Sequence, residues 1–209
     1  MRRLLPALFG LFVAVPLFAA LAPAEPLSIM RMMAPGPLPE MTLGDPAAPV
    51  TVVEYVSLTC SHCADFHRTT FEQLKTGYID QNKVYYVLRE FPLDPLAFAA
   101  IMAARCASED QFFPIVQGLF REQDNWAFVD NPAAALKAKL QPYGFSDESF
   151  AACLNRNDLA DKIIAVSERA ENDFDVHGTP TFFINGERHV GAIDPAELDG
   201  LLKPLLGKN

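Results

Sequence analysis

The order of strand-like and helix-like segments constrains the fold of this chain more than any other feature. The run VTVVEYV, Val50 to Val56, is β-branched and almost entirely apolar, which is typical of a strand covered on both faces in a parallel sheet. The stretch ADFHRTTFEQL, with helical spacing, comes next. A second strand-like run, Lys83 to Phe91, stops at Pro92. The order strand, helix, strand predicts a βαβ unit.

Helical periodicity begins after Pro95 and continues for about eighty residues before strand signals return. The stretch PTFFI, a turn at Asn185-Gly186 and the stretch RHV predict a hairpin. Asp194-Pro195 then caps a last helix that runs through Leu206. The predicted fold class is therefore α/β, with a βαβ half and a ββα half separated by a helical insertion.

The N-terminus has the parts of a secretory signal peptide. Arg2 and Arg3 precede an uncharged run from Leu4 to Leu21, and small residues follow at Ala22-Pro23-Ala24. We expect residues 1–24 to be cleaved and the mature chain to be exported. An uncleaved anchor is the alternative, because the apolar run approaches the length of a membrane span. Removing 24 residues from 209 leaves 185, enough for one domain with a core or for a domain with a large insertion.

Charge and cysteine content limit the possible partners. The formal net charge of -9 becomes -11 when Arg2 and Arg3 are removed. Such an acidic chain is a poor match for nucleic acid or anionic lipid. All four cysteines lie in the exported part, and an even number in an oxidising compartment favours disulfides.

The stretch SLTCSHCADF places Cys60 and Cys63 between the first strand and the following helix. Cys60 should lie in the first helical turn, where free N–H groups and the helix dipole stabilise a thiolate. His62 can add a positive charge or a hydrogen bond to the same sulfur. A Cys-x-x-Cys pair in this position has a first thiol of lowered pKa, and its disulfide is then a strong electron acceptor. We expect Cys60 to be the exposed, attacked sulfur and Cys63 to be buried against the helix.

Two other uses of a cysteine pair at this spacing are a structural disulfide and a zinc site. An inert structural disulfide would close too small a loop to stabilise much. A zinc site lacks a second Cys-x-x-Cys, and His62 and His67 interleave with the cysteines instead of following them across a loop. We therefore predict no metal and no other cofactor.

Two motifs together carry a family resemblance. The stretch LGDPAAPVTVVEYVSLTCSHCADF and the distant HGTPTFFINGERHVG resemble the DsbA-like branch of the thioredoxin superfamily, from about Thr42 to the C-terminus. The resemblance implies a thioredoxin fold with an inserted helical domain. The expected boundaries are an extended lead at 25–41, a first half at 42–94, the helical insertion at 95–173 and a second half at 174–209.

The resemblance also implies roles for individual residues. Cys60 would be the nucleophile and Cys63 the resolving cysteine, with the dipeptide Ser61-His62 between them. In this family the proline that matches Pro180 is cis and faces the disulfide, and the preceding residue, here Thr179, offers backbone hydrogen bonds to a bound peptide. The best-known oxidases of this branch have Pro-His where this chain has Ser-His. Thr179 resembles the isomerase-type members more than the valine of strong oxidases.

Glu54 interrupts the first strand six residues before Cys60. A carboxylate there should be desolvated and could relay the proton of Cys63. Family members place an acid at the matching position. The alternative is an edge-strand glutamate that reaches solvent.

Cys106 and Cys153 fall on separate predicted helices of the insertion. A bridge between them would close roughly fifty residues and stabilise the fold by about 4 kcal/mol in the chain-entropy model. Some members of this branch also carry a second disulfide in the helical domain. We expect a structural bridge, and the alternatives are two separate buried thiols or a second redox pair.

The sequence as a whole predicts a periplasmic thiol:disulfide oxidoreductase that acts as a protein disulfide oxidase. Its expected substrates are unfolded or partly folded exported proteins with free thiols, and its expected reoxidant is a quinone-linked, DsbB-like membrane protein. We expect a monomer. The alternatives are a disulfide isomerase or reductase of the same fold, a redox-inactive chaperone, or a copper-binding module using the methionines of the lead.

Overall fold

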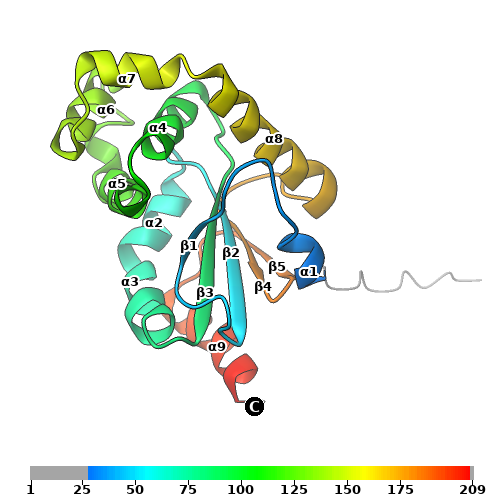
Figure 1. Cartoon of the computed structure of the whole chain (residues 1–209). Helices are drawn as coiled ribbons and strands as arrows, with labels where there is room; N and C mark the ends of the chain where they lie inside the picture. Colours follow the sequence, from blue (N-terminus) through cyan, green and yellow to red (C-terminus); the bar gives the residue numbers. More distant parts are fainter. Residues whose placement is uncertain (1–27, 208–209) are drawn as a thin grey trace, which may run out of the picture.

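A five-stranded sheet organises residues 28–207, which are the part of the chain described by this computed structural model (Figure 1). The predicted signal peptide, 1–24, lies outside these residues. The strands pair in the order β1-β3-β2-β4-β5. Strands β2 and β3 are parallel, and the other pairs are antiparallel. The strands are β1 (Met41–Leu43), β2 (Val50–Val56), β3 (Val84–Glu90), β4 (Thr181–Ile184) and β5 (Glu187–Val190).

Helices cover both faces of the sheet, so the three central strands, β2, β3 and β4, alternate between two cores. One face packs against α2 (Ser61–Thr69), α3 (Phe71–Leu74) and α9 (Pro195–Leu206). The other face packs against α8 (Asn157–Phe174). In β2, Val52 and Val56 belong to the first core, whereas Val53 and Tyr55 belong to the second. This two-sided burial explains why the β2 sequence is nearly continuous in apolar residues.

The inserted helical domain lies between β3 and β4 and forms the upper part of the molecule in Figure 1. Several of its helices begin at side-chain caps that the sequence carries. Asp94 and Asn131 accept from the N–H groups of Ala97 and Ala134, and Ser146 forms a capping box. Its elements are α4 (Pro95–Cys106), α5 (Glu109–Arg121), η2 (Gln123–Asn125), α6 (Pro132–Leu140), η3 (Gln141–Tyr143), α7 (Asp147–Leu154) and α8. The predicted fold class is confirmed, and a short π-helical segment, η1 (Lys75–Ile79), leads from α3 towards β3.

The prediction of an extended lead at 25–41 is wrong in part. The short helix α1 (Ile29–Met32) lies in this segment, and β1 begins at its last residue and pairs with β3. Elements of four and three residues are too short to show a period in sequence. Their stability comes from contacts with distant parts of the chain.

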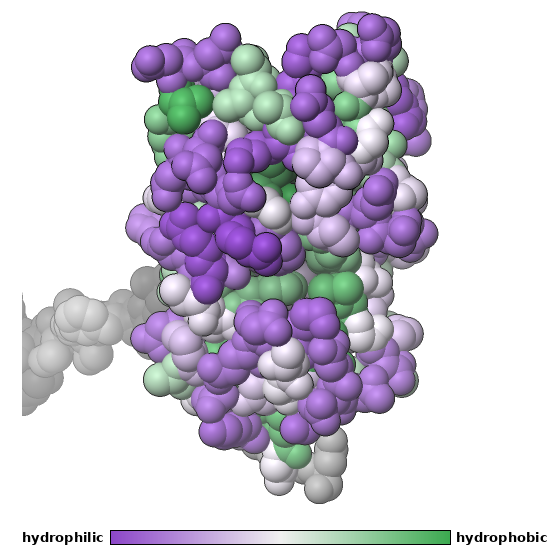
Figure 2. All heavy atoms as spheres, turned by 90° about the vertical axis from the view of Figure 1, so that its left-hand side faces the viewer, coloured by the Kyte–Doolittle hydropathy of each residue, from purple (hydrophilic) through white to green (hydrophobic). Residues whose placement is uncertain are grey.

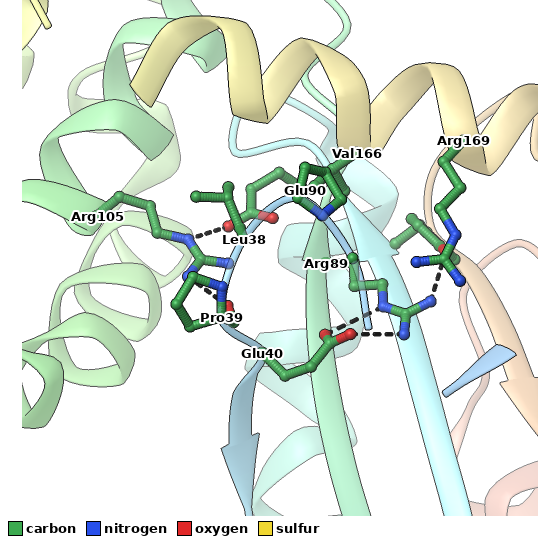
Figure 3. Close-up of a pocket in the computed structure, with 11 residues that line it drawn as sticks. Leu38, Pro39, Glu40, Arg89, Glu90, Arg105, Val166 and Arg169 are labelled. Carbon is green, nitrogen blue, oxygen red and sulfur yellow. Dashed lines mark hydrogen bonds and ion pairs between the residues drawn. The ribbon is translucent and has the colours of Figure 1, made fainter. Parts of the chain in front are cut away.

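Three arginines of the main body hold the lead in place (Figure 3). Arg89 of β3 donates to Glu40 at 2.7 Å and to the backbone oxygen of Met32 at 2.8 Å. Arg105 of α4 donates to the backbone oxygen of Pro39 at 2.8 Å, and Arg169 of α8 donates to that of Ala34 at 3.0 Å. The lead is thus fastened to both the sheet and the helical domain.

The methionines of the lead do not gather into one site. Met32 is completely buried in the core beneath α8, where its sulfur accepts from Arg89. Met41 is buried in the opposite core, and Met30 is exposed. The clustering in sequence reflects separate packing positions, which argues against a copper site.

None of the helices in residues 28–207 combines the length and the hydropathy needed to cross a membrane.

Candidate active site

The turn from β2 into α2 places the two cysteines at the end of the central strand. Cys60 is the N-cap residue of α2, one position before the first helical turn where we had expected it. Gln123 of η2 stabilises this turn, because its side-chain amide nitrogen donates to the backbone oxygens of Leu58 at 2.8 Å and Cys60 at 3.0 Å. The thiol of Cys60 therefore lies on a turn whose backbone is held by these two hydrogen bonds.

The second motif lies directly against the first. The sulfur of Cys60 is 3.2 Å from the backbone oxygen of Thr179, although 119 positions separate the two residues. The Thr179-Pro180 peptide bond is cis, as the resemblance implied. Pairing of β4 with β2 brings this loop beside the N-terminus of α2. The structure thus brings Cys60, Thr179 and Pro180 together.

The surroundings of Cys60 lower the pKa of its thiol to about 5. The largest cause is a hydrogen bond from the Cys63 side chain, against which partial burial acts in the opposite direction. The backbone N–H groups of Cys63 and His62 lower the pKa further. A thiolate at a helix N-terminus is stabilised by these donors.

Cys63 has the opposite character. Its side chain is completely buried on the inner side of α2. Burial raises the pKa of its thiol well above the ordinary value, and the hydrogen bond to the Cys60 side chain and the charge of Glu54 raise the pKa further. Two cysteines three positions apart thus favour different protonation states at neutral pH.

His62 and Ser61 are exposed on the first turn of α2. His62 lowers the pKa of Cys60 through its backbone N–H group. The imidazole charge that we expected to act on the sulfur is not among the main causes of the shift. The backbone N–H groups at the helix N-terminus contribute part of the stabilisation.

Glu54 is completely buried in the central strand β2, so an edge-strand glutamate reaching solvent is excluded. It lies on the same sheet face as α2, beneath Cys63. Its carboxylate accepts from the hydroxyl of Tyr86 at 2.5 Å and lies 3.2 Å from the imidazole of His67.

Cys106 and Cys153 form a disulfide between α4 and α7, with an S–S distance of 2.11 Å. It joins two helices of the inserted domain, and Cys60 and Cys63 are free thiols. Two separate thiols at 106 and 153 are therefore excluded. No group of three or more His, Cys, Asp and Glu side chains within residues 28–207 is placed to hold a metal ion.

The sequence reasoning did not identify three polar residues beside this site. Gln123 and Gln117 lie in the helical insertion, where nothing in the sequence separates them from surface glutamines. His67 was considered only as a metal ligand. Its position four residues after Cys63 was an available signal, since residues at this spacing share a helix face.

Comparisons with known proteins agree with this geometry. A family model described as thioredoxin matches residues 38–204. A Rickettsia felis protein, provisionally named a protein-disulfide oxidoreductase, is 37% identical over 148 residues, which are 70% of this chain and 53% of that protein. The chain thus spans about half the length of the curated relatives it matches.

Solved structures are similar over most of the chain. Wolbachia pipientis alpha-DsbA1 has a TM-score of 0.77 and 30% identity, over 85% of this chain and 96% of that one. A protein-disulfide isomerase from Novosphingobium aromaticivorans has a TM-score of 0.72 and 26% identity, over 81% and 98%. The resemblance inferred from the two motifs is confirmed, and the chain belongs to the thioredoxin family, in its DsbA-like branch.

Proposed function

We propose that this chain is a thiol:disulfide oxidoreductase that forms disulfides in exported proteins through Cys60 and Cys63. The observation that carries the proposal is the contrast between the two thiols. The pKa of Cys60 is lowered to about 5, whereas that of Cys63 is raised by burial. A partly exposed leaving group of low pKa next to a buried partner is what dithiol-disulfide exchange requires.

In the proposed reaction, a substrate thiolate attacks Sγ of Cys60 in the Cys60-Cys63 disulfide. The bond to Cys63 breaks, its electron pair remains on Cys63, and a mixed disulfide joins the substrate to Cys60. A second substrate thiolate then attacks the substrate sulfur of this mixed disulfide. The substrate leaves oxidised, and Cys60 leaves as a stable thiolate.

Each neighbouring residue has a role in this proposal. The backbone of Thr179, beside the cis Pro180, binds the substrate chain. Ser61 and His62 contribute the helix N-terminus and the exposed surface around the sulfur. Glu54 exchanges the proton of Cys63, and the Cys106-Cys153 bridge is structural.

The direction of electron flow favours an oxidase, because a stabilised thiolate makes the reduced form favourable and the disulfide oxidising. Thr179, a residue type found at this position in isomerase-type members, supports an isomerase or reductase as the second candidate. So does the similarity to a protein named a disulfide isomerase.

Equilibration with glutathione separates these candidates. A reduction potential of about -120 mV would support the oxidase, and one of about -270 mV, as in thioredoxin, would refute it. Insulin reduction by the wild type and by Cys60→Ser tests the redox chemistry itself. A redox-inactive chaperone or a copper-binding module would show no thiol-dependent activity for this variant to lose.

The cellular setting is part of the same proposal. A signal-peptide-like N-terminus and the likeness to alpha-DsbA1 support a periplasmic protein that acts on partly folded substrates with free thiols, and we expect it to act as a monomer. A quinone-linked, DsbB-like membrane protein would reoxidise it. Trapping such a partner as a mixed disulfide with Cys63→Ala in the native periplasm tests this assignment.

A further inference from the structure

Strand β1 forms one edge of the sheet and lies along an open groove. Its inner side pairs with β3, and no strand within residues 28–207 pairs with its outer side. The groove has a volume of about 770 Å³, and all three residues of β1 line it. Figure 2 views the side of the molecule on which β1, α3 and α5 lie, and apolar atoms show there between polar surfaces. The outer N–H and C=O groups of such an edge strand can pair with another extended chain.

Helices α3 and α5 supply apolar surface to this groove. Phe71 of α3 and Phe113 of α5 line it, together with Leu43 of β1. Leu43 and Phe113 are only partly buried, so a bound chain would cover more of their surface. Pro114 also lines the groove and has no N–H group, so the backbone oxygen of Asp110 lacks its usual donor within α5. The groove therefore offers both apolar contacts and backbone hydrogen-bonding groups.

The groove is acidic where α5 begins. Glu109 and Asp110, in the first turn of this helix, line the groove and are exposed. Neither carboxylate forms an ion pair within residues 28–207, whereas Lys75, which also lines the groove, pairs with Asp80 at 2.7 Å. Acidic residues in a first turn also interact favourably with the helix dipole, so their charge alone would not define a site. Beside an open strand edge, however, the two carboxylates favour a basic side chain in the occupant.

The shape of the groove suits an extended occupant. A smaller pocket of about 200 Å³ shares Met41 and Glu109 with the groove and reaches Pro39 and Glu40, the two residues before β1. The open surface thus follows the direction of the chain through β1. A polypeptide in the β conformation matches such a path better than a compact molecule does.

A chain that reacts at Cys60 can reach this groove. Phe71 follows Cys60 by eleven residues along α2 and α3, which corresponds to about 16 Å at the helical rise. An extended chain spans this distance with about five residues. Cys60, Thr179 and Pro180 do not line the groove, so one substrate chain could occupy both places at once.

We propose that the groove binds an extended segment of the polypeptide substrate, which pairs with β1 as a sixth strand and places a basic side chain beside Glu109 and Asp110. The inference rests on the proposed function and names its substrate class. The preferred substrates carry a basic residue next to alternating apolar residues, about five or more residues from the reacting cysteine. Every second side chain of the segment faces Phe71 and Phe113. A second copy of this chain is a poorer occupant, because it would bring the same carboxylates and an acidic net charge.

The first test is the binding of a fluorescein-labelled peptide, Lys-Val-Ser-Val-Ser-Val-Lys-amide, to the reduced chain at low salt, followed by fluorescence polarisation. In Glu109→Lys/Asp110→Lys we expect binding to weaken about 10-fold, because two attractions become repulsions. The same peptide with glutamates in place of its lysines should bind this variant more tightly than the wild type. Reversing Asp147 and Glu148, the acidic residues in the first turn of α7, is the matched control and should leave binding unchanged. Equal binding of the lysine peptide to the wild type and to Glu109→Lys/Asp110→Lys would overturn the proposal.

The position of the bound peptide gives a second readout. In ¹⁵N spectra of the reduced wild type, the amide signals of Thr42 and Leu43 should shift as the peptide is added. Shifts around Cys60 that leave β1 unchanged would overturn the proposal. So would a concentration-dependent dimer of the wild type that Glu109→Lys/Asp110→Lys abolishes, because the groove would then belong to a second copy of the chain.

Oxidation of a longer peptide separates the groove from the redox chemistry. This peptide joins a cysteine, a five-residue Gly/Ser spacer and the lysine segment, and it reduces the Cys60-Cys63 disulfide in stopped flow. We expect its half-maximal rate at about a 10-fold lower concentration than for the glutamate version, with the same maximal rate. Equal concentration dependences would overturn the inference and leave the proposed function intact. If neither peptide is oxidised while the cysteine-free peptide still binds along β1, the proposed function fails and the groove assignment stands.

Discussion

Removing the Cys63 side chain should raise the pKa of Cys60, because its hydrogen bond is the largest cause of the lowered value. Cys63→Ala deletes this donor and leaves the backbone N–H groups of residues 62 and 63 in place. Cys63→Ser is the matched control, since its hydroxyl can still donate to the sulfur.

The size of the change follows from the strength of such bonds. A hydrogen bond to a charged group contributes about 1.5–3 kcal/mol, and one pKa unit corresponds to about 1.4 kcal/mol. Because Cys60 is only partly buried, solvent screening favours the lower end of this range. We therefore expect the pKa to rise by roughly 1 unit in Cys63→Ala and by less in Cys63→Ser.

The assay is the ultraviolet absorbance of the thiolate, followed from acid to neutral pH in the reduced proteins. The pH dependence of alkylation by iodoacetamide gives the same pKa independently. If Cys63→Ala titrates at the wild-type pKa of about 5, the side-chain bond is not the main cause of the shift. The helix N-terminus and Thr179 would then account for it.

Three further outcomes are expected. Arg105→Met leaves the Glu90 carboxylate, only 1% exposed, without its ion-pair partner and should lower the free energy of unfolding by about 3–5 kcal/mol. Adding Glu90→Leu to this variant should restore most of the lost stability. Equal urea midpoints for the wild type and Arg105→Met would contradict this expectation. Replacing Cys106 and Cys153 by alanine should cost about 4 kcal/mol of stability for a loop of this length and leave the glutathione equilibrium of Cys60 unchanged, and a shifted equilibrium would indicate a second redox role. Above pH 5 the reduction potential should fall by roughly 30 mV per pH unit, because reduction adds a proton to Cys63 alone. Below pH 5 it should fall by roughly 60 mV per pH unit, because both thiols of the reduced form are protonated. A single slope over the whole pH range would contradict the low pKa of Cys60.

Local signals predicted the elements that hold the cysteines. The apolar run of β2 marks a strand buried on both faces, and the polar cap residues of the insertion mark the starts of its helices. The family resemblance supplied the contact between Thr179 and Cys60, which no local pattern contains. It also supplied the cis bond at Pro180.

Tertiary contacts decided what the sequence could not predict. The segments α1 and β1 are too short for periodicity and depend on Arg89, Arg105 and Arg169 from other elements. The exposed ring of His62 is not among the main causes of the lowered pKa of Cys60, whereas its backbone N–H group is one of them. The sequence does not distinguish His67 from the other three histidines. Tertiary contacts place its ring between two phenylalanines and next to Glu54.

The opposite behaviour of Cys60 and Cys63 follows from helix geometry. An N-cap residue lies where the unpaired N–H groups of the first turn point, whereas a residue three positions later lies on the side wall of the helix. Here that wall faces the sheet, and Glu54 points up from β2 because every second residue of the strand faces α2. The same packing that keeps Cys63 protonated also separates it from water at the substrate face.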